Sequence, residues 1–155
     1  MNDLDRRQKI SLIIVTYNRK DMLEEVLSAI VTQTRLPDEV IVVDNNSSDA
    51  TKEVVLSFKD KLNMHYVFEG VQGTSTARNT GIKNASNDII VFTDDDCVPE
   101  KEWLYHLEQP FLRDPSIGVV GGEILGCRVK GTMVEDFCIA DAILRVGDPN
   151  AKEEA

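Results

Sequence analysis

Three consecutive carboxylates, Asp94, Asp95 and Asp96, follow a run of apolar residues at positions 89–92, with only Thr93 between them. An uninterrupted apolar run with β-branched residues predicts a strand that is buried on both faces. Bringing three like charges to the end of such a strand costs free energy, because they repel one another. Carboxylate oxygens are the hard ligands that Mg²⁺ and Mn²⁺ prefer, and Mg²⁺ is typically held by one or two carboxylates plus phosphate oxygens. We therefore expect a divalent-cation site here, with a solvated acidic turn as the alternative.

Three further polar segments carry side chains suited to ligand binding. Thr16, Tyr17 and Asn18 end one apolar run, and Asp44 ends another. The segment 70–81 is rich in glycines and hydroxyls and precedes a predicted helix, whose free N–H groups could cradle a phosphate. This segment lacks the spacing of the known glycine-rich nucleotide-binding loops, so by itself it does not identify a phosphate site.

Arg78 and Asp44 each allow two interpretations. Arg78 lies in the first turns of a predicted helix, where a cation gains nothing from the helix dipole. An anionic ligand or a carboxylate is therefore its expected partner. Asp44 either caps the helix that follows it or accepts hydrogen bonds from a ligand, and its position alone favours neither role.

The periodicity of apolar residues predicts the elements that position these side chains. Strands are expected near residues 10–17, 39–44, 63–68, 89–92 and 117–124. The first helix is expected to follow Asn18, as its capping residue, and to end at about residue 34. A second is expected around 54–58, and a third is opened by segment 70–81 and ends at about residue 85. Two more are expected at 101–113 and 134–146. Alternating strands and helices predict an α/β fold with a doubly wound, mostly parallel sheet. The carboxyl ends of its strands, where such sheets bind ligands, would gather the polar segments described above.

The bulk composition restricts the partners of the protein. The 155-residue chain has a formal net charge of −10 and lacks a dense basic face, so we expect no nucleic-acid binding. Its apolar runs are too short for a membrane span. Its three cysteines and two histidines lack the spacing of a disulfide framework or a zinc site. We expect a cytoplasmic protein, either free or peripheral at the inner face of the membrane. The composition is compatible with a homo-oligomer.

Four segments together resemble the family 2 glycosyltransferases, which are nucleotide-diphospho-sugar transferases of the Rossmann-related GT-A fold. They are residues 13–19 (IIVTYNR), 42–49 (VVDNNSSD), 76–82 (TARNTGI) and 91–99 (VFTDDDCVP). Each segment alone is a modest match, whereas the four in this order and spacing are specific. The resemblance covers residues 10–122 approximately.

The resemblance implies an inverting, metal-assisted transfer of a sugar from a nucleoside-diphosphate donor to a hydroxyl of a glycan, lipid or protein acceptor. It places Thr16, Tyr17 and Asn18 along the nucleotide pocket and gives Asp44 a hydrogen bond to the base. Arg78 and Asp95 would lie beside the donor. Asp94 would face the ribose and, together with Asp96, hold Mg²⁺ or Mn²⁺, whose charge would stabilise the leaving diphosphate.

The resemblance weakens in the C-terminal part of the chain. Members of the family supply a general base from a carboxylate beyond these motifs, and Glu135 and Asp136 are the candidates here. They lack the family's flanking Gly-Phe-Asp/Glu pattern, and an exposed acid pair on a helix is the alternative. We expect a flexible N-terminus at 1–9 and a nucleotide-sugar-binding α/β domain at 10–126. Residues 127–155 would add a partial acceptor-side segment and a polar tail to that domain, as in the donor-binding part of a longer transferase.

Two other functions fit parts of the sequence. Residues 94–98 also match the Asp-x-Asp-x-Val loop of haloacid-dehalogenase-like phosphatases, but the later Gly-Asp-x-x-x-Asp of those enzymes is missing after Gly147 and Asp148. A nucleotide-sugar-binding module without transfer activity is the second alternative, because no convincing general base is present. Acceptor-dependent sugar transfer separates this module from an enzyme, whereas donor binding does not.

We predict that the 155-residue chain binds a donor but transfers its sugar poorly, because a positioned general base typically contributes about 10²–10⁴-fold. Slow donor hydrolysis is expected when the chain is incubated with UDP-, dTDP- and GDP-sugars and a panel of acceptors, with nucleotide release and product mass as readouts. Fast acceptor-dependent turnover that disappears in Glu135→Gln or Asp136→Asn would contradict this prediction and identify the base.

Overall fold

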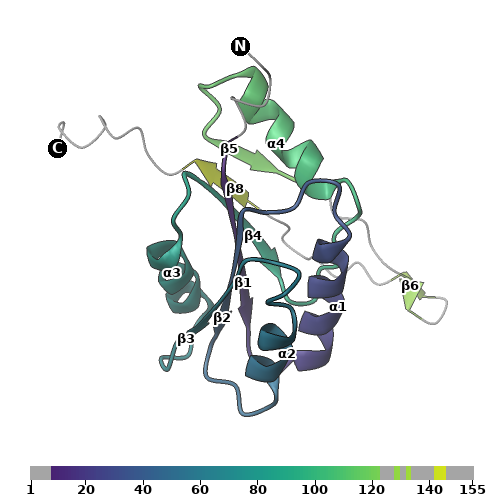
Figure 1. The fold of residues 1–155 in the computed structure, drawn as a ribbon, viewed down its shortest axis with the longest axis vertical. Coiled ribbons are helices and arrows are strands. Elements are labelled where there is room, and N and C mark those ends of the chain that lie inside the picture. The colour runs from purple at the N-terminus through teal and green to yellow at the C-terminus, as the bar shows by residue number, and fades with distance from the viewer. Residues whose placement is uncertain (1–7, 123–127, 130–131, 134–141, 146–155) are drawn as a thin grey trace.

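A computed structural model describes residues 8–122, 128–129, 132–133 and 142–145 of the chain. The described part holds a six-stranded sheet with helices on both faces (Figure 1). The elements in chain order are β1 (Ile10–Thr16), α1 (Lys20–Val31), β2 (Glu39–Asp44), α2 (Thr51–Ser57), β3 (Met64–Phe68), α3 (Thr74–Asn84), β4 (Ile89–Asp94), α4 (Trp103–Arg113), β5 (Val119–Gly121), β6 (Arg128–Val129), β7 (Thr132–Met133) and β8 (Ala142–Arg145). None of the described helices is long and apolar enough to cross a bilayer.

Strand β1 lies at the centre of a parallel core, between β2 and β4, and the order of the whole sheet is β3-β2-β1-β4-β8-β5. The registers align the ends of these strands, because Thr16 pairs with Asp44 on one side and Val15 pairs with Asp94 on the other. The predicted doubly wound, mostly parallel sheet is therefore confirmed, and the polar strand ends meet at one edge.

The two faces of the sheet bury different residues of the same strands, as the alternation of side chains along a strand requires. Ile10, Leu12 and Ile14 of β1 face the layer formed by α1, α2 and α4, whereas Ile13 faces α3. Figure 1 shows α3 alone on one side of the sheet, opposite α1 and α2. Neighbouring residues at the end of a strand are consequently directed towards different helices.

Two expected elements in the later part of the chain differ from the structure. The helix expected at 134–146 is wrong at its end, because Ala142–Arg145 forms strand β8, antiparallel to β4 and β5. The remainder of that range, which includes Glu135 and Asp136, lies outside the described residues. The strand expected at 117–124 is reduced to the three residues of β5 within the part that the structure describes.

Helix α3 approaches the sheet closely at Gly81. A Cβ built there would lie 2.5 Å from Cγ2 of Ile13 and 3.3 Å from Cγ2 of Val43, both of which are buried in the sheet. Neither methyl group can yield easily, since each belongs to a β-branched side chain on a central strand. Gly81 therefore sets the distance at which α3 packs, and so the place from which Arg78, on the same helix, reaches the strand ends.

We expect Gly81→Ala to lower the free energy of unfolding by about 1–2 kcal/mol, because overpacking exceeds the roughly 1 kcal/mol that alanine gains in helix propensity. Urea unfolding followed by circular dichroism measures the change. Lys83→Ala, at an exposed position of the same helix, is the control and should stay within about 0.5 kcal/mol of wild type. A Gly81→Ala protein that is as stable as wild type would show that α3 does not pack this closely.

Candidate functional site

A cleft of about 320 Å³ opens at the carboxyl ends of β1, β2 and β4 and beside the start of α3. Its lining includes Thr16, Tyr17, Arg19, Asn45, Thr74, Arg78, Asp94, Asp95 and Asp96. Most of the residues predicted from sequence thus line one concave site, as the parallel topology requires. Asp44 and Asn18 are not among the lining residues.

Asp94 and Asp95 are adjacent in sequence but interact with different parts of the structure. Asp94 accepts a hydrogen bond of 3.0 Å from Nη2 of Arg78 on α3. Asp95 is directed to the other face, where its Oδ2 accepts a hydrogen bond of 2.7 Å from the hydroxyl of Thr16. The expectation that Arg78 pairs with an anion or a carboxylate is confirmed.

Asp95 is the buried member of the three acids, with 5% of the residue exposed. Burial raises the pKa of the Asp95 carboxyl above its usual value, and the contacts with Thr16 and Arg19 oppose that shift. Its Oδ1 lies 3.1 Å from Nη1 of Arg19. With both oxygens engaged by the protein, Asp95 acts as a brace between the ends of β1 and β4.

Arg19 is a site residue that the sequence analysis missed. Its Nη1 donates to Oδ1 of Asp95 and also, over 2.9 Å, to Oδ2 of Asp96. The only sequence signal was its position, three residues after Thr16 at a strand end that was already expected to line the site. Its partners are more than 70 residues away in sequence, so local pattern could not reveal them.

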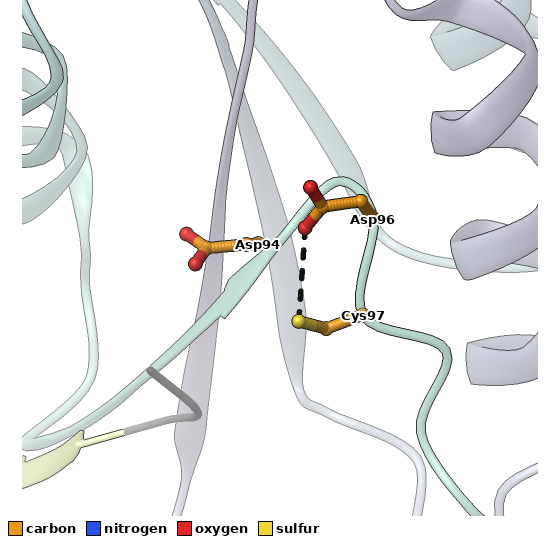
Figure 2. Close-up of side chains that lie close together, drawn as sticks. All are labelled: Asp94, Asp96 and Cys97. Carbon is orange, nitrogen blue, oxygen red and sulfur yellow. Dashed lines mark hydrogen bonds between the residues drawn. The ribbon is translucent and has the colours of Figure 1, made fainter. Parts of the chain in front are cut away.

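Asp94 and Asp96 are the residues in the described part of the chain best placed to hold a divalent cation. One oxygen of each, together with Sγ of Cys97, lies in a group whose atoms are all within 4.8 Å of one another (Figure 2). Mg²⁺ and Mn²⁺ prefer oxygen to sulfur, so the two carboxylates are the suitable ligands in this group. Two carboxylates open to a cleft suit an ion whose other ligands are phosphate oxygens and water.

Asp44 is buried, with 3% of the residue exposed, and both of its oxygens are engaged. Oδ1 accepts a hydrogen bond of 2.8 Å from N–H of Ser47, and Oδ2 accepts one of 2.7 Å from the hydroxyl of Tyr66. Burial first, and then this carboxylate, raise the pKa of the Tyr66 hydroxyl above its usual value. Asp44 therefore stabilises the turn after β2 and does not cap α2, which begins only at Thr51.

Asn45, the neighbour of Asp44, lines the cleft and was not predicted as a site residue. Its side-chain amide donates to the carbonyls of Glu69 and Val71, at 3.2 and 2.8 Å, and its Oδ1 accepts from N–H of Gly73 at 2.8 Å. One side chain thus holds the whole loop that leads into α3. Gly73 has a φ of 145°, a conformation that a residue with a Cβ rarely adopts.

The loop after β1 is fixed by a similar set of bonds. Oδ1 of Asn18 accepts a hydrogen bond of 2.7 Å from N–H of Ser48, which ties this loop to the loop after β2. The prediction that Asn18 caps α1 is wrong, because helix α1 begins after Arg19, and Asp49 accepts the bond from N–H of Lys20. Asp49 also accepts a hydrogen bond from N–H of Thr51 and so serves the starts of α1 and α2 together.

Tyr17 lines the cleft, and 48% of this residue is exposed.

Comparison with curated proteins finds relatives that are named transferases. Glycosyltransferase AglE of Haloferax volcanii is 40% identical over 119 residues, which cover 74% of this chain and 39% of that protein. Validoxylamine A glucosyltransferase of Streptomyces hygroscopicus subsp. limoneus is 32% identical over 149 residues, or 90% of this chain and 33% of that protein. The chain thus spans between 33% and 39% of the length of these two relatives.

Solved structures with the same fold are GT-A transferases. The mannosyltransferase PcManGT of Pyrobaculum calidifontis, in complex with GDP-Man and Mn²⁺, matches 77% of this chain and 36% of its own, with a TM-score of 0.69 and 31% identity. TarS residues 1–349 of S. aureus, in complex with UDP-GlcNAc, matches 81% of this chain and 36% of its own, with a TM-score of 0.69 and 29% identity. These matches confirm the predicted fold class.

The family model described as glycosyl transferase family 2 matches residues 11–133, a span that contains every described residue of the cleft. A family match of this extent leaves the phosphatase alternative without support. The chain belongs to glycosyl transferase family 2.

Proposed function

We propose that the cleft binds a nucleoside-diphosphate sugar and that the protein serves the transfer of this sugar to an acceptor hydroxyl, with inversion at the transferred carbon. The observation that carries the proposal is that one cleft holds both carboxylates that could bind a cation and guanidinium groups that could bind phosphate. Asp94 pairs there with Arg78, and Asp96 pairs with Arg19. The donors GDP-Man and UDP-GlcNAc in the related transferase structures support it. The acceptor in this proposal is a hydroxyl of a glycan, a lipid or a protein.

Asp94 and Asp96 would hold Mg²⁺ or Mn²⁺ in this proposal. The Mn²⁺ of the PcManGT complex supports the assignment, as does the proximity of the carboxylate oxygens of Asp94 and Asp96. A bound cation of this kind neutralises the charge that develops on a leaving diphosphate. The three carboxylates outnumber the two guanidinium groups that contact them, so an excess of one negative charge attracts a dication to the site.

The remaining roles follow from where each side chain lies. Tyr17 is exposed in the cleft and suits a contact with the nucleoside, whereas Thr16 contributes by fixing Asp95. Arg78 pairs with Asp94 and would lie near the donor phosphates. Asn18 would act indirectly, through its hydrogen bond to Ser48, which holds the loops after β1 and β2 together. Asp44 would reach the base by giving up one of its present hydrogen bonds or would shape the pocket through the Ser47 turn.

We predict that nucleotide binding depends on the metal and on Asp96. Calorimetric titration of UDP and GDP should give a higher affinity in Mn²⁺ than in EDTA for one of the two nucleotides. Asp96→Asn removes a charged hard ligand and should reduce the affinity in Mn²⁺ to the value measured in EDTA. Asp88→Asn is the matched control, because Asp88 is exposed next to the opposite end of the same strand and should keep wild-type affinity. Equal affinity in Mn²⁺ and EDTA would refute the metal assignment.

We predict that Asp44 contributes to nucleotide affinity beyond its contribution to stability. Tyr66→Phe removes the hydrogen bond between these side chains and Asp44→Asn weakens it, and each should lower the free energy of unfolding by about 1–3 kcal/mol. Only Asp44→Asn should also weaken UDP or GDP binding, as measured by calorimetry well below the melting temperature. If Asp44→Asn binds as tightly as Tyr66→Phe, Asp44 has no role in reading the base.

A further inference from the structure

Arg19 occupies an electrostatically unusual position at the rim of the cleft. It precedes α1 directly, at the end of the helix where the dipole disfavours a cation, and no side-chain cap bond is formed at that residue. Its side chain is half exposed, with 51% of its area accessible. Local structure therefore gives no reason for the guanidinium to lie where it does. Its contacts with Asp95 and Asp96 provide that reason.

The two contacts of Arg19 are unequal in kind. Asp95 is buried and also held by Thr16, so this carboxylate is a fixed anchor. Asp96 is exposed, with 40% of its side chain accessible, and it belongs to the pair of carboxylates suited to a divalent cation. A dication bound by Asp96 would compete with the guanidinium for the same carboxylate and would repel it, since both charges are positive.

We infer that Arg19 is a placeholder cation, which neutralises Asp96 in the metal-free protein and exchanges with the divalent cation when that ion binds. The inference rests on the metal site of the proposed function. The Asp95 contact keeps the released guanidinium in the cleft, where a diphosphate is its natural partner because a planar fork of N–H donors matches phosphate oxygens. Arg19 then couples the two binding events: metal binding frees the arginine that the donor needs.

Arg78 does not fit the same role. Within the described part of the chain its carboxylate partner is Asp94, so release from that residue would leave it without the second carboxylate anchor that Arg19 has in Asp95. Arg78 also projects from the middle of α3, which is held close to the sheet at Gly81. The bridging geometry of Arg19, with one nitrogen shared between two carboxylates, is what allows one contact to be exchanged while the other persists.

The test measures Mn²⁺ binding to the nucleotide-free 155-residue chain by the electron paramagnetic resonance signal of free Mn²⁺. Arg19→Ala removes the competing cation, so its Mn²⁺ affinity should rise by about two- to fivefold over wild type, the range expected for loss of a partly exposed ion pair. Lys20→Ala is the matched control, because it removes one positive charge next door, where the ammonium pairs with the exposed Asp21. It should leave Mn²⁺ affinity unchanged, and Arg19→Lys should lie between Arg19→Ala and wild type.

A second readout tests the coupling. With Mn²⁺ saturating, Arg19→Ala should bind UDP or GDP about tenfold more weakly than wild type in calorimetry, because a charge-assisted hydrogen bond to phosphate is lost. Unchanged nucleotide affinity would overturn the coupling.

The direction of the Mn²⁺ result separates the inference from its alternatives. If Arg19 only braces the carboxylates, its removal weakens Mn²⁺ binding, and that result or an unchanged affinity overturns the exchange. An equal gain in Lys20→Ala also overturns it, because the effect is then one of net charge. Mn²⁺ binding that appears only in Arg19→Ala supports the exchange. Absence of Mn²⁺ binding in both proteins overturns the inference and the proposed metal site together, whereas binding that the substitution fails to tighten overturns the inference alone.

Discussion

The site depends on the way that the end of β4 and the turn after it direct neighbouring carboxylates towards the two faces of the sheet. Repulsion between adjacent carboxylates is reduced because Asp94 meets an arginine from α3, whereas Asp95 meets a hydroxyl from β1 and an arginine from the start of α1. Asp94 is the last residue of β4 and Asp95 is the first residue of the turn that follows, so the chain directs the two side chains apart without a positive φ at either residue. Because the two carboxylates lie on different faces of the sheet, each face must supply its own hydrogen-bond donor. The residue before α1 and the middle of α3 are thus both tied by side-chain contacts to the end of β4.

The scaffold around these charges is held largely by side chains that bond to backbone. Asn45 fixes the loop before α3, Asn18 joins the loops after β1 and β2, and Asp49 serves two helix starts. Bonds of this kind position loops at low entropic cost once the sheet has formed, since each amide or carboxylate satisfies several backbone groups together. Against this fixed framework Arg19 is the exception, because its side chain is half exposed and bridges a buried and an exposed partner.

Sequence patterns predicted the parallel core well, because β1, β2 and β4 each contain an uninterrupted run of four apolar residues that allows few alternatives. The clustering of Thr16, Asp95 and Asp96 followed from topology, since parallel strands end at a common edge. Arg19 and Asn45 were missed because their roles depend on partners brought close only by the fold. The four residues of β8 were assigned to a helix because a short apolar run does not distinguish a strand from a buried helical turn. Asn18 is a suitable cap by residue type, yet Asp49 reaches the helix start from a neighbouring loop.

The position of β8 in the sheet has a consequence for the way the protein is made on the ribosome. The parallel strands β1 to β4 are complete once residue 94 has been synthesised, but the neighbour of β4 on its other side is β8, which begins at Ala142. Strand β5, although translated earlier, pairs with β8 and so must wait for it within the described sheet. During that interval the outer edge of β4 presents unpaired backbone groups, the feature that makes nascent sheets prone to associate with one another. Residues 95–141 must therefore be synthesised between the completion of the parallel half of the sheet and the first residue of the strand that closes its open edge.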